Sequence, residues 1–355
     1  MSLTVLSVAY PLAPVGPEAV GGAEQVLGEI DQALVSRGHT SLVVACEGSK
    51  PAGTLFPVKA PTRFFDCIDH SWSMRVQAAL DAAIASHPID LIHMHGMDFY
   101  RYKLPRHIPT LVTLHMPIAW YPAQIWQGRC DNVQFQCVSY SQRSTCPPSH
   151  SQIPVVPNGV ALPPPNERAN DDFAIALGRI CPEKNFHAAL SAGTLAKTRV
   201  VLCGRVFPYT AHQNYFREKV WPMVCDEGAV HHSFLGAVGP RRKHRLLQRA
   251  KCLLLPTRAP ETSSLVAMEA LAAGTPVIAY RSGAIPDIVE DGVTGFLVDS
   301  VEAMAQAIRR VDALDRRLCR RAAERRFSRD QMIRGYLHLY QQHISACSEI
   351  NEKRE

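Results

Sequence analysis

Two carboxylates, Glu261 and Glu269, lie eight positions apart in the sequence E-T-S-S-L-V-A-M-E and enclose three small hydroxyl residues. Ionised carboxylates accept strong hydrogen bonds from hydroxyl groups, such as those of a sugar or a ribose. The hydroxyl residues at 262–264 are of the types favoured where a helix begins, and a helix start offers unpaired N–H groups and partial positive charge to a phosphate. The segment therefore carries the groups that a sugar nucleotide needs.

The apolar pattern predicts the elements that would position these groups. Residues 251–255 form a short apolar run, which predicts a buried strand that ends in the loop carrying Glu261. Apolar residues then recur at helical spacing, so a helix should begin near Ser263. At a rise of ~1.5 Å per residue, Glu269 lies roughly 7 Å from that start, about the span from a diphosphate to a ribose. Two glutamates at this spacing also occur by chance, so the pair needs support from its surroundings.

Short apolar strands alternate with helical patterns along the whole chain. Strands are expected at 3–9, 42–45, 90–93, 111–114, 135–139, 172–177, 199–203, 232–235, 251–255 and 276–279, and helices at 23–36, 76–85 and 330–343. This alternation predicts an α/β protein with parallel sheets. Proline-rich stretches at 147–154 and 163–165 interrupt the pattern and mark a boundary between two domains. Two doubly wound sheets that face each other would leave a cleft at the carboxyl ends of their strands.

Length and composition agree with an enzyme of two domains. The 355 residues, 46% of them hydrophobic, suffice for two cores of roughly 150 to 170 residues each. No run of 18 apolar residues is present, so no membrane span is expected. The apolar start, M-S-L-T-V-L-S-V-A-Y-P, lacks a basic region and a cleavage site and is better explained as a first strand than as a signal peptide.

The eleven cysteines and the paired histidines give little support for a metal site. No C-x-x-C pair occurs, and the closest group, Cys130, Cys137 and Cys146, is too irregular for a zinc knuckle. Several cysteines fall in expected strands, as reduced core thiols would: Cys46, Cys203 and Cys252. Alternation would put His93 and His95 on one face of a strand, where packing is favoured over metal ligation. We therefore expect no metal.

The net charge of +6 is unevenly distributed. Nine arginines lie in the stretch 309–329, and R-R-K-H-R occupies 241–245. A solvated helical face is the favoured explanation of both clusters. The alternative is attraction to an anionic surface, such as membrane lipid in a peripheral contact, or to an acidic acceptor. Nucleic acid is the least favoured partner, because no recognition motif accompanies the charge.

Several segments occur in an order typical of one enzyme family. They are G-G-A-E-Q-V at 21–26, D-L-I-H-M-H-G at 90–96, T-L-V-T-L-H-M-P at 110–117, V-P-N-G-V at 156–160, G-R-I-C-P-E-K-N at 178–185, and the stretch from 261 to 298. Together they resemble the family 4 retaining glycosyltransferases over nearly the whole chain. The resemblance implies the GT-B architecture: an acceptor-side domain at 1–157, a nucleotide-sugar-binding domain at 158–328, and a helix at 329–355 that crosses back to the first domain.

The resemblance also implies an activity. A sugar would move from a nucleoside diphosphate sugar to an unidentified hydroxyl acceptor, a small molecule, a glycan or a lipid-linked sugar, with retention of configuration and without a metal or other cofactor. UDP-glucose is the first donor to consider, because such enzymes use it often. The implied location is cytoplasmic.

In the family's pattern, Arg179 and Lys184 neutralise the departing diphosphate, and the backbone N–H groups of Ser264 and Leu265 share that task. Ser263 belongs to the same helix start. These roles follow from the resemblance, because singly each basic residue could equally be a surface ion-pair partner.

The remaining expected contacts concern the sugars. Glu261 would bind hydroxyls of the donor sugar, and Glu269 those of the ribose. His115 would line the donor sugar and support an oxocarbenium-like transition state. Gly22 and Gly204 would let the backbone approach the donor closely.

Other functions remain open at this stage. A sugar-nucleotide epimerase on the same plan would act without an acceptor, and a non-catalytic subunit would bind the donor without transfer. A glycan phosphorylase would need a pyridoxal-phosphate lysine motif that the sequence lacks. The first strand is not followed by G-x-G-x-x-G, and G-x-x-x-x-G-K-S/T is absent, which argues against a dehydrogenase and a P-loop enzyme. The chain departs from the family at 262–264, where Phe-Gly is common after the first glutamate. Two roles are equally open for three aromatic residues, stacking on an acceptor sugar or packing in the core: Trp120, Tyr121 and Trp126.

Overall fold

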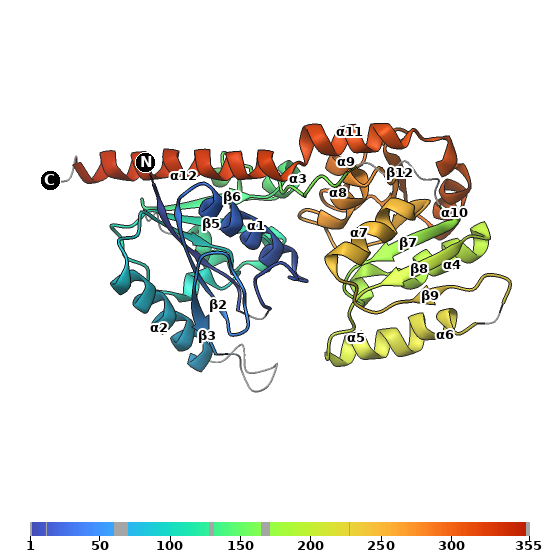
Figure 1. The fold of residues 1–355 in the computed structure, drawn as a ribbon, viewed down its shortest axis with the longest axis horizontal. Helices are drawn as coiled ribbons and strands as arrows, with labels where there is room; N and C mark the ends of the chain where they lie inside the picture. The colour runs from blue at the N-terminus through green and yellow to red at the C-terminus, as the bar shows by residue number, and fades with distance from the viewer. Residues whose placement is uncertain are drawn as a thin grey trace. The chain divides into compact units, whose positions relative to one another are not determined.

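The structure is a computed structural model and describes residues 2–11, 13–59, 70–127, 131–164, 171–226 and 228–352. The chain forms two compact units, shown in Figure 1. The first comprises Met1–Asn158 with Asp330–Glu355, and the second comprises Gly159–Arg329. The sequence analysis expected junctions at 157/158 and 328/329. Each unit contains a six-stranded sheet in which every pair of neighbouring strands is parallel.

The first unit has the strand order β3-β2-β1-β4-β5-β6. Its strands are β1 (Thr4–Val8), β2 (Thr40–Cys46), β3 (Thr54–Val58), β4 (Leu91–Met94), β5 (Thr110–Leu114) and β6 (Val133–Cys137). Its helices are α1 (Gly22–Ser36), α2 (His70–Ser86), α3 (Tyr140–Arg143) and α12 (Arg329–Glu352). The strand order reverses between β1 and β4, so the loops after these two strands flank a switch point where α/β sheets bind ligands.

The second unit has the order β12-β11-β10-β7-β8-β9. Its strands are β7 (Phe173–Leu177), β8 (Arg199–Cys203), β9 (Ser233–Phe234), β10 (Cys252–Leu255), β11 (Val277–Tyr280) and β12 (Gly295–Val298). Its helices are α4 (Phe186–Ala196), α5 (Thr210–Tyr215), α6 (Trp221–Val224), α7 (Pro240–Arg249), α8 (Leu265–Ala272), α9 (Ile285–Ile288), α10 (Val301–Arg310) and α11 (Arg316–Arg326). Here the order reverses between β7 and β10. The two stretches singled out in the sequence, 178–185 and 261–269, follow these strands.

Two strands, β3 and β12, were not predicted, and both lie at sheet edges. The sequence of β3, T-L-F-P-V, contains a proline, which a strand tolerates at an edge because no ladder hydrogen bond is lost there. The last helix was expected at 330–343 and extends from Arg329 to Glu352. Alternating strands and helices, and the parallel sheets that this alternation predicted, are confirmed.

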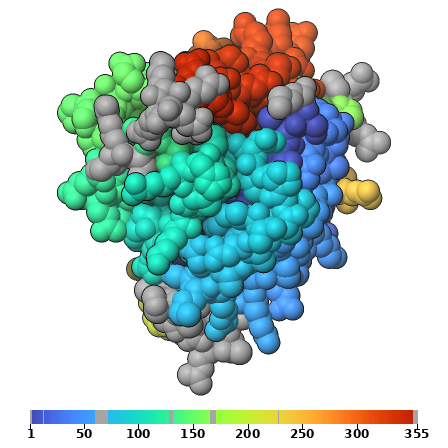
Figure 2. Space-filling model, turned by 90° about the vertical axis from the view of Figure 1, so that its left-hand side faces the viewer, coloured from blue at the N-terminus to red at the C-terminus, as the bar shows by residue number. Residues whose placement is uncertain are grey.

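The helix α12 packs on the sheet of the first unit through aromatic and histidine side chains. Tyr336 and Tyr340 are among the largest fully buried side chains of the chain. His343 Nε2 donates to the backbone oxygens of Thr110 and Asn132, at 3.1 and 3.0 Å, and so ties the helix to β5 and to the residue before β6. Figure 2 shows the red C-terminal helix resting on the blue-to-cyan surface of this unit.

Several residues of the arginine-rich stretch act within the fold. Arg316 donates to the backbone oxygens of Gln248 and Ala250, and its guanidinium is half-buried. Three more donate to backbone oxygens of the second unit: Arg309, Arg320 and Arg326. Attraction to an anionic surface stays a prediction for the exposed remainder. Among helices of the described chain, none combines the length and apolar character of a membrane span.

The described cysteines are free thiols. Those expected in strands are buried in β2, β8 and β10: Cys46, Cys203 and Cys252. Cys130 lies outside the described residues, while the sulfur atoms of Cys137 and Cys146 lie 3.7 Å apart.

Candidate active site

The loops after β7 and β10 are joined by direct hydrogen bonds. Asn185 Nδ2 donates to the backbone oxygen of Pro256 at 3.1 Å, and the backbone N–H of Arg258 donates to the backbone oxygen of Glu183 at 2.9 Å. Asn185 is buried and has a φ of +55°, a left-handed conformation that asparagine tolerates better than most residues. These contacts hold the two candidate segments, which are far apart in the sequence, at the switch point of the sheet.

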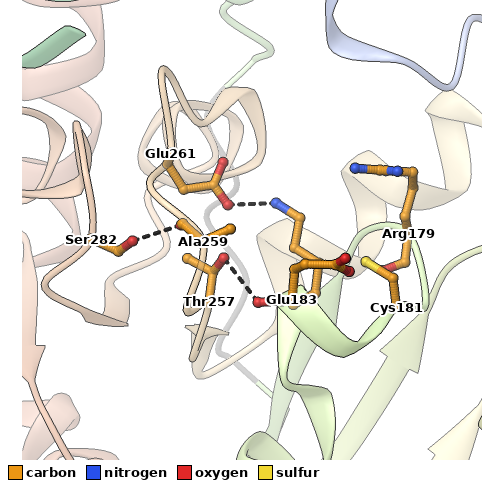
Figure 3. Close-up of polar contacts among 8 residues, drawn as sticks. Arg179, Cys181, Glu183, Thr257, Ala259, Glu261 and Ser282 are labelled. Atoms are coloured by element: carbon orange, nitrogen blue, oxygen red, sulfur yellow. Dashed lines mark hydrogen bonds and ion pairs between the residues drawn. The ribbon is translucent and has the colours of Figure 1, made fainter. Parts of the chain in front are cut away.

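Lys184 and Glu261 form an ion pair across these loops. Lys184 Nζ lies 2.5 Å from Glu261 Oε1, and the two side chains are only 23% and 13% exposed. Figure 3 shows the Arg179 side chain extending to the same side of the loops as the Glu261 carboxylate. The structure thus brings Glu261 to Arg179 and Lys184, which the sequence analysis had placed in a separate motif. Their roles toward a donor remain predictions.

A glycine sets the position of Glu261. The backbone N–H of Ala284 donates to the backbone oxygen of Glu261 at 2.7 Å. Gly283 has a φ of +53°, and a Cβ at this residue would lie 2.1 Å from the same oxygen. Only glycine combines this conformation with so close an approach. The start of the motif G-A-I-P-D, at Gly283 and Ala284, therefore packs against the backbone of Glu261 and fixes its position.

The helix α8 begins at Leu265, two residues after the expected start near Ser263. Ser264 occupies the N-cap position, but its side chain makes no capping hydrogen bond. Ser263 Oγ is buried and finds no hydrogen-bond partner within the described residues. Buried polar atoms are normally paired, so this hydroxyl and the first amides of α8 suit a ligand that supplies acceptors.

The second glutamate has a cationic partner that the sequence analysis missed. Lys243 Nζ lies 2.5 Å from Glu269 Oε1, and both side chains are about one-fifth exposed. Lys243 belongs to the cluster R-R-K-H-R of α7, for which a solvated helical face was favoured. That expectation is wrong for Lys243, because α7 packs against α8 and turns this lysine toward Glu269.

Gly204 contributes to the site through the backbone. A Cβ at Gly204 would lie 1.9 Å from the backbone oxygen of Gly178, so the loops after β7 and β8 can pack only with glycine here. The N–H of Gly204 donates to the backbone oxygen of Gly236 at 2.8 Å. A direct contact between Gly204 and a donor stays a prediction.

Three side chains beside Arg179 have metal-ligand chemistry. Ligand atoms of Cys181, Glu183 and His212 lie within 4.8 Å of one another. Figure 3 shows the Cys181 sulfur next to the Glu183 carboxylate. Burial first and the Arg179 charge second lower the pKa of His212, so a cation in this group would meet a neighbouring guanidinium. This charge disfavours a metal ion there.

The first unit holds the other two expected residues, His115 and Gly22. Gly22 is the first residue of α1, directly after Gly21 at the N-cap position, where the loop that follows β1 ends. His115 directly follows β5, and its Nε2 lies 3.0 Å from Nδ1 of His95, which directly follows β4. His95 Nε2 lies 3.1 Å from His93 Nδ1, so the two alternate histidines do share a face.

Burial lowers the pKa of all three histidines. The pKa of His115 falls to about 4, and those of His93 and His95 fall well below 6.5. All three rings are therefore neutral near pH 7.

These depressed values predict a pH-dependent stability. A histidine whose pKa is lower in the folded than in the unfolded chain stabilises the fold above about pH 6.5, and this contribution is lost as pH falls toward the folded value. For His115 alone the shift to about 4 corresponds to on the order of 3 kcal/mol. We expect the unfolding temperature of the first unit to fall steeply between pH 6.5 and 4. His95→Asn should flatten this slope, while His107→Asn, at an exposed position, should not. If the unfolding temperature fell equally with pH in His95→Asn and in wild type, the buried histidines would not be the cause of the pH dependence.

The aromatic residues near His115 divide between core and surface. Tyr121 is buried, and its hydroxyl accepts a hydrogen bond from the backbone N–H of Met116 at 3.2 Å. Trp126 packs edge-on against Phe135. Trp120 is 50% exposed, and it is the one of the three expected aromatics with a large open surface.

Two family descriptions match adjoining parts of this chain. "Glycosyltransferase Family 4" matches residues 20–163, and "Glycosyl transferases group 1" matches residues 162–327. Both units are thus covered, in the order that the resemblance implied. The chain belongs to the family 4 glycosyltransferases.

Among similar proteins, the Salmonella typhimurium lipopolysaccharide 1,2-N-acetylglucosaminetransferase is 25% identical over 63% of this glycosyltransferase chain and 63% of its own length. A D-inositol 3-phosphate glycosyltransferase of Corynebacterium diphtheriae is 36% identical over 34% of this chain and 26% of its own length. The matched parts are less than two thirds of either relative.

Solved structures share the fold of this glycosyltransferase. Sucrose-phosphate synthase from Thermosynechococcus elongatus superposes with a TM-score of 0.76 at 18% identity, over 97% of this chain and 100% of its own. Anabaena HepE in complex with UDP and glucose gives 0.70 at 18% identity, over 96% and 99%. The two doubly wound parallel sheets are therefore those of the GT-B fold, as expected.

Proposed function

We propose that this glycosyltransferase moves a sugar from a UDP-linked donor to a hydroxyl acceptor with retention of configuration. The observation that carries the proposal is the pair of ion pairs around α8. Glu261 precedes the helix and pairs with Lys184, while Glu269 lies within the helix and pairs with Lys243 of α7. In each pair a cation can bind the diphosphate, and a carboxylate can accept hydrogen bonds from the hydroxyl groups of the sugar on that side.

In the proposed reaction, the bond between the anomeric carbon and the diphosphate oxygen breaks, and the diphosphate leaves with added negative charge. Lys184, Arg179 and the first amides of α8 stabilise that charge. The acceptor hydroxyl attacks from the face that the diphosphate leaves, and the leaving phosphate takes its proton. His115 lies beside the donor sugar and stabilises its oxocarbenium-like transition state. In this scheme, basic side chains and backbone amides stabilise the leaving diphosphate, and no metal ion is required.

The choice of donor is supported by the similar proteins. HepE was solved with UDP and with UDP-glucose, and the Salmonella relative is named for transfer of N-acetylglucosamine. We therefore rank UDP-glucose first and UDP-N-acetylglucosamine second. A glycan or lipid-linked acceptor, peripheral membrane contact through the stretch 309–329 and a cytoplasmic location are parts of the same proposal.

The experiment is to incubate the full chain with a panel of nucleotide sugars and measure released nucleoside diphosphate, with and without candidate acceptors, in the presence and absence of EDTA. The proposal expects acceptor-dependent release of UDP that EDTA does not abolish, and an α-linked product from an α-linked donor. Interconversion of the donor without acceptor would indicate the epimerase instead. Donor binding without any release would indicate the non-catalytic subunit.

Replacing Glu269 tests the ribose contact. Loss of charged hydrogen bonds costs about 1.5–3 kcal/mol, so we expect Glu269→Ala to weaken UDP binding by roughly ten- to a hundredfold in a calorimetric titration. Lys243→Ala should have a smaller effect, because Glu269 would keep its acceptor oxygens. Glu302→Ala, at an exposed position of α10, serves as the control and should bind as wild type does. Equal affinity in Glu269→Ala and the control would contradict the ribose contact.

A further inference from the structure

A buried glutamine, Gln142, holds the backbone on both sides of His115. It lies in α3, where the hydroxyl of the N-cap residue Ser139 accepts a hydrogen bond from the backbone N–H of Gln142 at 3.0 Å. Gln142 Nε2 donates to the backbone oxygens of Leu114 and Met116, at 2.6 and 2.9 Å. Gln142 is only 4% exposed, so water hardly competes for these two oxygens. One side chain thus fixes the residue before His115 and the residue after it.

The hydrogen-bond partners determine the orientation of the Gln142 amide. Its Oε1 accepts from the backbone N–H of Val138 at 2.8 Å, while its Nε2 faces two carbonyl oxygens. In the reverse orientation the amide oxygen would face two oxygens and the nitrogen would face an N–H, so all three hydrogen bonds would be lost. Both amide hydrogens are therefore used on the backbone around His115. Gln142 can act on that histidine only by restraining its backbone.

A second side chain, that of Tyr121, restrains the same segment. Its buried hydroxyl accepts a hydrogen bond from the backbone N–H of Met116 at 3.2 Å. Both polar groups of the Met116 backbone therefore have a side-chain partner. A chain that leaves a sheet normally gains mobility, because the ladder hydrogen bonds end there. Here three side-chain hydrogen bonds restrain the segment at the point where β5 ends.

We propose that Gln142 is a positioning residue that, together with Tyr121, fixes the segment 114–116 and so places the His115 ring for sugar transfer. Gln142 itself contacts neither donor nor acceptor in this arrangement. The role in transfer rests on the proposed function, because His115 is assigned there to the donor sugar. The restraint on the backbone does not rest on that function, since it follows from the hydrogen bonds alone.

Two replacements of the same kind separate this role from a loss of stability. Gln142→Met keeps the length of the side chain and removes the amide, so both backbone oxygens lose their donor. Asn132→Leu removes an amide that also donates to two backbone oxygens, those of Pro105 at 3.2 Å and Ile108 at 2.9 Å. These oxygens lie before β5, at the opposite end of the strand from Gln142. Both variants should unfold at a lower temperature than wild type, because each leaves carbonyl oxygens without a donor.

Hydrogen–deuterium exchange of the full chain, followed on short peptides by mass spectrometry, measures the restraint. We expect the amides of 112–118 to exchange about tenfold faster in Gln142→Met than in wild type, the scale of losing two hydrogen bonds of a local restraint. Asn132→Leu should instead speed up exchange over 105–110 and leave 112–118 unchanged. Equal exchange over 112–118 in Gln142→Met and wild type would overturn the restraint.

Kinetics test whether the restraint serves sugar transfer. Gln142→Met should lower kcat by about ten- to a hundredfold, because a small displacement of a functional group costs up to about a hundredfold in rate. Its affinity for UDP should stay that of wild type, since the residues proposed to hold the diphosphate and the ribose belong to the second unit. Asn132→Leu should keep the wild-type kcat. An equal fall of kcat in both variants, or an unchanged kcat in Gln142→Met, would overturn the positioning role.

Tyr121→Phe replaces Gln142→Met if the latter does not fold, because it removes one hydroxyl from the segment and keeps the buried ring. Faster exchange over 112–118 and a lower kcat are then expected, and wild-type values of both would overturn the proposal.

Failure of the positioning role and failure of the proposed function are distinguishable. If the wild-type chain transfers no sugar, the proposed function fails, while the exchange rates still decide the restraint on 114–116. If the wild-type chain is active, and exchange becomes faster in Gln142→Met without any change in kcat, only the positioning role fails.

Discussion

Replacing Lys184 with alanine is expected to lower kcat for sugar transfer by about 100- to 1,000-fold, the range found when one preorganised group that stabilises developing charge is removed. Lys184 Nζ lies at the switch point of the second sheet, within 2.5 Å of Glu261, and its side chain is largely shielded from water. Charge on the leaving diphosphate grows as the bond breaks, so the lysine stabilises the transition state more than the bound donor. The effect should therefore be larger on kcat than on KM. Single-turnover measurements with the donor identified by the panel check this result.

Lys219→Ala is the matched control for that variant. Lys219 is an exposed lysine of the same unit, in the segment between α5 and α6, and it forms no ion pair among those observed in the described residues. The control should keep the wild-type rate, and both variants should unfold at similar temperatures. If Lys184→Ala kept an activity within about tenfold of wild type, the proposed charge-stabilising role would be contradicted, because tenfold corresponds to only about 1.4 kcal/mol of activation free energy.

Gly283→Ala is expected to have the second large effect, on both stability and activity. An added Cβ would overlap the backbone of Glu261, at 2.1 Å from its oxygen and 2.6 Å from its nitrogen, in a left-handed conformation. The conformation costs about 1–2 kcal/mol for a residue with a Cβ, and the overlap adds about 1–3 kcal/mol of overpacking. Relief of the overlap would displace Glu261, so transfer activity should be largely lost in the fraction that folds. Denaturant unfolding and the diphosphate-release assay measure the two effects.

Gly292→Ala separates the two causes. Gly292 also has a positive φ, +76°, but an added Cβ would meet no atom within 4 Å among the described residues. In this variant the free energy of unfolding should fall only by the cost of the left-handed conformation, about 1–2 kcal/mol, and the transfer activity should be kept. Equal losses in the two variants would show that the contact between Gly283 and Glu261 does not set the position of the glutamate.

The sequence predicted the local elements of this fold well because their signals are local. The strand at 199–203 was expected at its observed bounds, and the helix after Glu261 began two residues late. Apolar runs and helix-start residues act within a few positions of themselves. The strands β3 and β12 were missed: β3 contains a proline, β12 begins with a glycine, and each pairs with a neighbour on one side only.

Contacts between distant segments were beyond the sequence. Lys243 pairs with a glutamate 26 positions further along the chain, and no periodicity within α7 distinguishes this lysine from its basic neighbours. Likewise, alternation predicted that His93 and His95 share a face, but not that β5 pairs with β4 and brings His115 beside His95. Sheet order and helix packing determine such neighbours. The family resemblance supplied the individual site residues, whereas their partners became visible only in three dimensions.

The most direct test is a crystal structure of the full chain soaked with the nucleoside diphosphate that binds best in titration. We predict that the diphosphate oxygens lie within hydrogen-bond distance of the amides of Ser264 and Leu265 and of Lys184 Nζ, and that ribose hydroxyls donate to Glu269. A diphosphate bound away from the start of α8, or a ribose that makes no contact with Glu269, would contradict the account.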